Sequence, residues 1–465
     1  MNEIKLRLPS LPTDIHCLIL EQLSHSDYVS LSLVSHACRI QCEPFMFRTL
    51  ALGARKQRNS STPLSITHSL ERHVRNIFSG ILKRQRDNDP ASIIESLERH
   101  KGRLANLVRH LVVPSNVDKT FVSAKTILRI MKSAKNLTSF SWNANHPIPS
   151  SVLAALHCDH PSVHLMVTSC NRQGYPLDEA LLSSPQLHTL DLTVSCTHRG
   201  IYHLEEGICE LTYLKTLLVR GGNLKVLRLR LIRLEPQSEG AKTQFKETMA
   251  WAAGPFNFRF EETDKFPTLE ELVILQGGSY EPAYELSAKH CSDWSYAMDW
   301  SEMRVLNLGS SDAEHLLPEI TGLVPKLHTL RFNPSSINHN ILQSFLDNLP
   351  QLKDLTLVAG ETSHVYVPGF DTAVTKVCST VGPQLHTLHI DCEVHLAKSW
   401  LPGRFQEILG FCPQLRCFES VVGPQVAIGE WREEMVGMSA CEKYGLMEVN
   451  GTVEPGMMFY DPFVK

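Results

Sequence analysis

Pro350-Gln351-Leu352-Lys353-Asp354-Leu355-Thr356-Leu357 is the stretch that decides the fold of this chain. In an extended segment Leu355 and Leu357 face one side, while Thr356 between them faces the other. The proline cannot continue a helix and favours extended geometry in the residue before it. Apolar residues at helical spacing end just before the proline: Leu342, Phe345, Leu346 and Leu349. This stretch therefore predicts a helix that is followed at once by a short strand.

The same order of helix, proline and strand recurs along the chain. Copies with Pro-x-Leu start at Pro185, Pro267, Pro325, Pro350, Pro383 and Pro413. Copies without the proline start at Val108, Leu137, Leu214 and Met303. No single unit of this kind buries its own apolar side, so neighbouring units must stack.

The repeated Leu-x-x-Leu-x-Leu pattern resembles leucine-rich repeats with irregular units. This resemblance covers residues 106–425 and implies an α/β solenoid, a horseshoe with parallel strands on its concave face. The Asn or Cys that usually follows the third leucine is missing from most copies, so the repeat boundaries stay open. A doubly wound α/β domain also alternates strands and helices, but the repeated motif favours the solenoid.

The N-terminal segment predicts short helices with more apolar surface than they bury among themselves. Two stripes recur at helical spacing: Ile15, Leu18, Ile19 and Leu23, then Leu31, Val34, Ala37 and Cys38. Residues 24–27, Ser-His-Ser-Asp, break the first helix and offer side chains that cap the second. Leu20 and Leu33 lie off the stripes, so apolar groups cover more than one face. A unit of about forty residues is marginal alone, and a second protein is the natural cover for its remaining apolar surface.

Five short motifs within this segment carry a resemblance to an F-box. They are Leu11-Pro12-x-x-Ile15, Ile19-Leu20-x-x-Leu23, Leu31-Ser32-Leu33-Val34-Ser35, Arg39 and Pro44-Phe45-x-Phe47-Arg48. The resemblance implies three helices that dock on a Skp-type adaptor and, through it, on a cullin–RING ubiquitin ligase. The contact residues it implies are Leu8, Pro9, Leu11, Pro12, Ile15, Ile19, Leu20, Leu23, Leu31, Leu33, Val34 and Arg39. Cys38 stands where many members have a large aromatic residue. The alternative is an ordinary helical hairpin that packs on its own domain.

The expected organisation follows from these two patterns and is similar to that of F-box proteins of filamentous fungi. The predicted parts are an F-box at 1–52, a helical linker with a basic face at 53–105, irregular repeats at 106–425 and a C-terminal cap at 426–465. Insertions rich in aromatic residues interrupt the repeats at 230–268 and 276–302. Such insertions can project and carry specificity, but aromatic padding of a degenerate repeat is the interpretation we favour.

Composition and charge exclude several classes of function. The 465 residues are 43% hydrophobic and 20% charged, which is typical of a folded protein. A formal charge of −4 argues against general attraction to nucleic acid or to anionic membranes. The sequence has no membrane-spanning run and no secretory h-region at its start, which predicts a cytoplasmic or nuclear protein. The 13 cysteines are odd in number and form no Cys-x-x-Cys pair, so we expect reduced thiols.

No catalytic, metal or cofactor site is expected. The chain lacks phosphate-binding glycine loops, a nucleophile elbow and His-Glu-x-x-His. Residues 157–160, His-Cys-Asp-His, are predicted as a turn before Pro161. His386 and His389 have odd spacing on a predicted strand, so they face opposite sides and cannot easily share an ion.

The remaining candidate is the polar face of the predicted strands. The residues expected to face outward are Asp191, Arg228, Arg230, Val273, Asn307, Arg331, Thr356, His389 and Glu419. Among them Arg228, Arg230, Arg331 and His389 are the candidates for binding a client, because guanidinium groups pair with carboxylates and phosphates in bidentate fashion. The alternative is that these side chains are simply solvated.

These patterns predict a non-enzymatic adaptor with a docking segment and a recognition array. The F-box would bind a Skp-type protein while the repeats hold an unknown protein client for ubiquitination. Two alternatives stay open: a scaffold that acts outside any ligase, and a receptor whose repeats form a pocket for a small ligand.

Overall fold

The computed structural model describes residues 13–52, 103–115, 123–169, 177–196, 210–233, 256, 258–276, 286–311, 313–335, 337–359, 369–391 and 402–420. Most of the predicted linker, the predicted cap and the predicted contact residues Leu8, Pro9, Leu11 and Pro12 lie outside these ranges. The chain divides into two compact units, Met1–Leu306 and Asn307–Lys465, which are described separately below.

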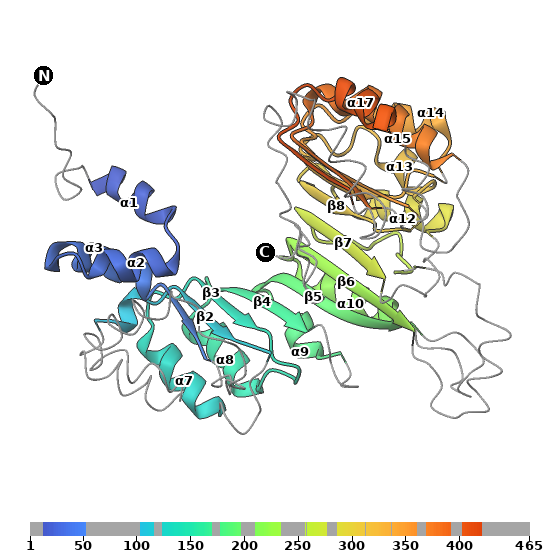
Figure 1. Ribbon diagram of the computed structural model, residues 1–465. Helices are drawn as coiled ribbons and strands as arrows, with labels where there is room; N and C mark the ends of the chain where they lie inside the picture. The colour runs from blue at the N-terminus through green and yellow to red at the C-terminus, as the bar shows by residue number, and fades with distance from the viewer. Residues whose placement is uncertain are drawn as a thin grey trace, which may run out of the picture. The chain divides into compact units, whose positions relative to one another are not determined.

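The described strands form one sheet whose order follows the chain (Figure 1). They are β1 Thr49–Ala51, β2 His110–Val113, β3 Ser139–Trp142, β4 His164–Ser169, β5 Leu187–Cys196, β6 Val226–Arg233, β7 Glu271–Gln276, β8 Val305–Asn307, β9 Thr329–Phe332, β10 Asp354–Val358, β11 Thr387–Asp391 and β12 Cys417–Ser420. Neighbours from β1 to β7 and from β9 to β12 are parallel. The strand order of a doubly wound sheet reverses partway, whereas this one never does. The predicted leucine-rich-repeat solenoid is therefore confirmed.

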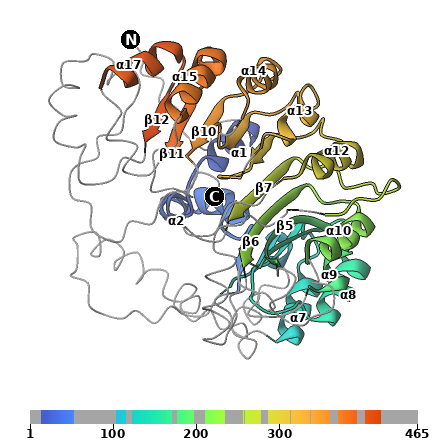
Figure 2. The same cartoon turned by 90° about the vertical axis from the view of Figure 1, so that its right-hand side faces the viewer.

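Described helices lie between most successive strands and, within each unit, line one face of the sheet (Figure 2). The N-terminal helices are α1 Thr13–Glu21, α2 His25–Ser32 and α3 His36–Met46. The repeat helices are α7 Ala124–Ser133, α8 Ser150–Asp159, α9 Glu179–Leu182, α10 Glu210–Gly221, α12 Ala288–Ala297, α13 Leu316–Ile320, α14 His339–Asp347, α15 Phe370–Val381 and α17 Pro402–Phe411. Short 3-10 turns lie at Ala105–Leu107 and Gly382–Gln384.

Aligned leucines form the core of each repeat. Leu330, Leu355 and Leu388 occupy the same register position on β9, β10 and β11, and each is at most 1% exposed. From the helical side, Phe345 of α14 and Val377 of α15 are completely buried. The helix and strand predicted around Pro350 therefore both form, and the stacking of units supplies the burial that one unit lacks.

One predicted strand is wrong. The motif that starts at Leu214 lies inside the helix α10, and the strand of this repeat is β6, which follows it. Leu211, Leu214 and Leu218 are buried on one face of α10, because residues spaced i, i+3 and i+7 share a helical face. In Leu-x-x-Leu-x-Leu the first two leucines have helical spacing and the last two have strand spacing, so the motif alone does not distinguish a helix from a strand.

Two further local differences concern the first repeats. Residues 157–159, expected in a turn, form the last residues of α8, and His160 caps that helix. The strands β1 and β4 were not anticipated by the repeat motif. β1 pairs with β2 through Leu50 and Leu111, so the sheet begins within the segment that the F-box motifs cover.

Candidate functional site

Side-chain caps define where the helices α2 and α3 begin. The hydroxyl of Ser24 accepts a hydrogen bond from the backbone N–H of Asp27 at 3.3 Å, and the Asp27 carboxylate accepts one from the Ser24 N–H at 2.9 Å. This capping box starts α2 and confirms that residues 24–27 break one helix and cap the next. The hydrogen bonds from the Ser24 side chain and backbone lower the pKa of Asp27. Ser35 caps α3 in the same way, because its hydroxyl accepts a hydrogen bond from the Cys38 N–H at 3.1 Å.

A small core holds the three helices together. Leu20, Cys38 and Cys42 are at most 5% exposed, and the Tyr28 hydroxyl donates a hydrogen bond to the Leu20 carbonyl. The rings of Tyr28 and Phe45 stack with centroids 5.6 Å apart. Burial raises the pKa of the Cys42 thiol, and the neighbouring Cys38 raises it by a smaller amount. Cys38 thus serves as a small core residue between the helices.

Four apolar side chains of the same segment, three on α1 or α3 and one in the link between α2 and α3, are exposed instead of buried. Ile15 is 44% exposed, Leu18 59%, Val34 73% and Ile40 52%. They are four of the seven large hydrophobic residues that are exposed in the described part of the chain. Of the predicted contact residues, Ile15 and Val34 belong to this apolar surface. Ile19, Leu23, Leu31 and Leu33 are half-buried, and Leu20 is in the core. The prediction omitted Leu18, although it lies on the helical stripe, and Ile40, which its motifs did not include.

Arg39 belongs to an ion-pair network that ties α3 to the first repeat. Its Nε lies 3.6 Å from Glu43 Oε1, and the Arg103 guanidinium lies 3.0 Å from Glu43 Oε2. Glu43 is only 8% exposed, so its charge is compensated by two partners. One of these partners comes from the same helix and the other from the segment before β2.

The candidate arginines on the strand face are neither free nor simply solvated. In the first unit the Arg228 Nε lies 2.6 Å from Glu271 Oε1, and the Arg230 Nε lies 3.8 Å from Asp191 Oδ1. In the second unit Arg331 donates a hydrogen bond to Asp391 Oδ2 at 2.8 Å. No local sequence pattern predicted these pairings, because each carboxylate lies on another strand. His389, the fourth candidate, is half-buried on β11.

Several other residues expected to face outward from the strands are buried. Asp191 is 7% exposed, Thr356 5%, Val273 2% and Asn307 0%. The Asn307 side-chain oxygen accepts a hydrogen bond from the Gly309 N–H at 2.9 Å, which shapes the turn after β8. The alternative that these side chains are simply solvated therefore does not hold at these four positions.

Aromatic residues from the two insertions form a packed cluster within the first unit. Phe256, Phe258, Trp294 and Trp300 are at most 1% exposed, and ring centroids lie 5.0 Å apart for Phe256 and Phe258. His290 lies among these rings, and burial lowers its pKa to about 4. The padding interpretation is confirmed for these residues, whereas Trp251, Tyr280 and Tyr284 lie outside the described ranges. Tyr296 is the exception, because it is 76% exposed.

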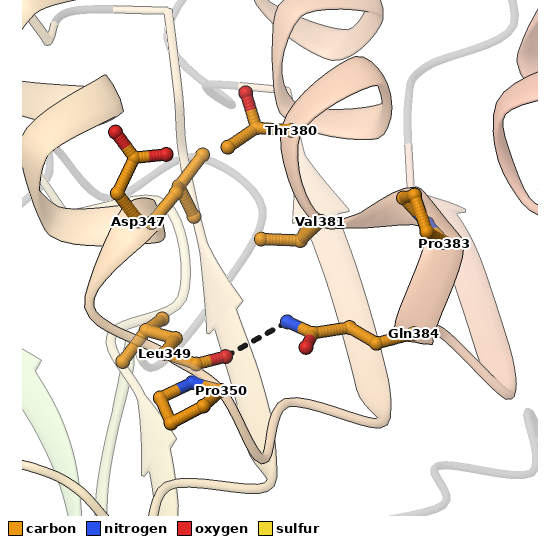
Figure 3. A pocket seen from close by; sticks show the side chains of 8 residues that line it. Asp347, Leu349, Pro350, Thr380, Val381, Pro383 and Gln384 are labelled. Atoms are coloured by element: carbon orange, nitrogen blue, oxygen red, sulfur yellow. Dashed lines mark hydrogen bonds between the residues drawn. The ribbon is translucent and has the colours of Figure 1, made fainter.

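A hollow of about 190 Å³ lies between α14 and α15 in the second unit (Figure 3). Its lining includes Asp347, Pro350 and Thr380. The Gln384 amide donates a hydrogen bond to the Leu349 carbonyl at 2.7 Å, and the Thr380 hydroxyl donates one to Gln343 Oε1 at 3.1 Å. These polar groups are already used to join neighbouring repeats, so the hollow is a seam between them.

The described ranges contain no cluster of three or more His, Cys, Asp or Glu residues that could hold a metal ion. None of their helices is long and apolar enough to cross a membrane.

Comparison with known proteins identifies the N-terminal segment. The F-box domain model matches residues 8–49. No curated protein matches the chain. A chain in the crystal structure of the yeast Rad7 and Elc1 complex is similar, with 11% identity, a TM-score of 0.34 and coverage of 74% of this chain and 97% of that chain. The three N-terminal helices fall within the matched residues, and the repeat sheet follows them along the chain. The chain therefore carries an F-box domain at residues 8–49, which is followed by an irregular leucine-rich-repeat array.

Proposed function

We propose that this protein is a non-catalytic adaptor of a ubiquitin ligase. Its F-box docks on a Skp-type protein, which links it to a cullin–RING ligase in the cytoplasm or nucleus. Its repeats bind a protein client. Partners carry out the transfer chemistry, and this chain contributes proximity by raising the local concentration of client lysines near the transfer enzyme.

The observation that carries this proposal is the apolar surface of the F-box helices. Ile15, Leu18, Val34 and Ile40 are each more than two-fifths exposed although the helices have a core of their own. Full burial of one such side chain is worth about 1.5–3 kcal/mol, so leaving four of them in water is unfavourable. A protein partner would cover these four apolar side chains, which lie on α1, in the link between α2 and α3, and on α3.

Copurification tests the proposal. The full chain is coexpressed with a Skp-type adaptor, and the complex is measured by size-exclusion chromatography with light scattering. We expect a stable one-to-one complex, and we expect replacement of Leu11 and Pro12 by Ala to remove it while the repeats stay folded. Absence of any complex, or full-strength binding by the double variant, would contradict the docking assignment.

A second readout separates the ligase adaptor from a scaffold. If the adaptor complex recruits a cullin, the chain acts within a ligase, as proposed. If the adaptor copurifies but a cullin never does, the scaffold function is favoured.

A further inference from the structure

Basic side chains occupy the same position in consecutive repeats of the second unit. His328, Lys353, His386 and Arg416 each stand one residue before a strand, from β9 to β12. We call these four residues the basic edge. The residues that follow them pair in register, with Thr329 opposite Asp354, Asp354 opposite Thr387 and Thr387 opposite Cys417.

Backbone hydrogen bonds fix the four residues as direct neighbours. The Lys353 N–H donates to the His328 carbonyl at 2.9 Å, and the His386 N–H donates to the Lys353 carbonyl at 2.7 Å. The Arg416 N–H then donates to the His386 carbonyl at 2.8 Å. Since neighbouring strands lie about 4.8 Å apart, the four side chains form a row about 14 Å long.

These side chains are available to a partner. Lys353 and Arg416 are exposed, and His328 and His386 are half-buried. The described residues provide no side-chain hydrogen bond or ion pair for Lys353, His386 or Arg416. The hydrogen bond given for the His328 ring among the described residues joins it to the adjacent hydroxyl, at 2.8 Å from Thr329 Oγ1. The acidic residue that follows Lys353, Asp354, accepts from the same hydroxyl at 3.4 Å.

The equivalent cations of the first unit are used internally. Arg109 donates a hydrogen bond to the Asn136 carbonyl at 3.0 Å, and Lys225 donates one to the Thr268 carbonyl at 3.3 Å. Arg304 lies 3.7 Å from Glu270, which stands at the same position one strand earlier. In the first unit the cations at this position bind other parts of the fold, whereas in the second unit Lys353, His386 and Arg416 have no such partner among the described residues.

We propose that the basic edge binds an acidic segment of a protein partner. An extended peptide rises about 3.3 Å per residue, so four or five residues span the row, and alternate carboxylates face it. Each exposed ion pair along the row contributes little affinity by itself. Several such pairs together give electrostatic specificity and fast association. Binding of an acidic segment by the basic edge does not depend on the proposed adaptor function. Only the identification of that partner as the client rests on it.

Fluorescence anisotropy with the full chain tests this inference. The probes are labelled peptides of six glutamates, of six glutamines, and of alternating phosphoserine and glycine. We expect saturable binding of the glutamate peptide, no binding of the glutamine peptide, and clear weakening when NaCl rises from about 50 to about 500 mM. Binding of the phosphoserine peptide at the same residues would also support an anion site and would assign phosphate as its preferred ligand if it were tighter.

Matched double variants locate the site. K353Q/R416Q removes two unpaired cations of the basic edge, and we expect about tenfold weaker binding. R109Q/R304Q removes two cations from the equivalent positions of the first unit, and we expect less than about a twofold change. Equal loss in both variants, no saturable binding, or equal affinity for a single-stranded RNA of the same charge would overturn the inference. Adaptor copurification is measured on each variant, so a failure of the proposed function is seen separately.

Discussion

Lys215 on α10 and Asp264 in the segment before β7 form a buried ion pair, with Nζ 2.5 Å from Oδ2. Their side chains are only 5% and 15% exposed. The Asp264 carboxylate also accepts a hydrogen bond from the Glu261 N–H at 2.9 Å. The pair joins a repeat helix to the segment that carries Phe258 and Phe266 into the aromatic cluster.

Lys215→Met should destabilise the first unit by about 3 kcal/mol, because it leaves the Asp264 charge buried beside a single backbone donor. Urea unfolding monitored by tryptophan fluorescence measures the loss, since Trp294 and Trp300 lie in the adjoining cluster. Arg220→Gln is the matched control, because Arg220 and Glu179 form an exposed ion pair worth less than about 0.5 kcal/mol. Equal urea midpoints for the two variants would show that the buried ion pair contributes no more to stability than the exposed one.

The same pair predicts acid sensitivity. Burial alone would raise the pKa of Asp264, but hydrogen bonds from Lys215 and Glu261 and the Lys215 charge outweigh it, so this pKa lies below its ordinary value. The stabilisation is present above the unfolded-state pKa of about 4 and is lost as the pH falls through the lower folded-state pKa. Asp264→Asn should flatten the stability profile in this range.

His290 predicts a second pH dependence at milder pH. Its folded pKa is about 4 because of burial, against an ordinary value of 6.5. Between these values the unfolded chain binds a proton that the folded chain does not, so stability decreases as the pH falls from 6.5 to 4. The full effect is on the order of 3 kcal/mol.

His290→Phe should weaken that dependence and raise stability at pH 5, because neither ring nitrogen of His290 has a hydrogen-bond partner. Thermal unfolding as a function of pH gives the measurement. His339→Gln, at an exposed position of α14, should leave the profile unchanged. A wild-type profile that is flat between pH 4 and 6.5 would argue against a neutral buried imidazole.

Gly382 is required by close packing between repeats. A Cβ at this position would lie 2.6 Å from the Phe411 carbonyl oxygen and 2.9 Å from the Cys412 Sγ, while φ is an ordinary −50°. Gly382→Ala should therefore destabilise the second unit by about 1–3 kcal/mol through overpacking.

Gly410→Ala is the control for Gly382, because a Cβ there meets nothing within 4 Å and the residue lies in α17. Helix propensity predicts that this variant is more stable by up to about 1 kcal/mol. Differential scanning calorimetry compares the two. A Gly382→Ala variant as stable as the wild type would mean that the Phe411 backbone shifts freely.

Adaptor docking should depend on the exposed apolar side chains of the F-box. Val34→Asp and Leu18→Asp should each weaken adaptor binding at least about tenfold, because a carboxylate would be desolvated in an apolar interface. Isothermal titration calorimetry with the purified adaptor measures the effect. Leu323→Asp places the same charge at an exposed leucine outside the F-box, at 44% exposure, and should bind normally. Normal binding by the Val34 and Leu18 variants would move the docking surface elsewhere.

The local spacing of apolar residues was sufficient to predict helices and strands where the buried residues follow that same spacing. The helix with Leu342, Phe345 and Leu346 and the strand with Leu355 and Leu357 both form as predicted. The same logic failed at Leu214, where leucine spacing fits a helix and a strand alike. There the decision came from neighbouring units, which bury Leu211, Leu214 and Leu218 as one helical face.

The sequence by itself determined the succession of F-box helices and strand–helix repeats, because both depend on contacts between residues close along the chain. Only the tertiary structure decided which side chains are available to partners. Arg331 finds its carboxylate at Asp391, 60 residues away, and Arg228 finds one at Glu271, 43 residues away. Among the described residues the same stacking leaves Lys353 and Arg416 without side-chain partners. Strand register and the packing of neighbouring repeats set the distances between these groups, and no local pattern encodes either of them.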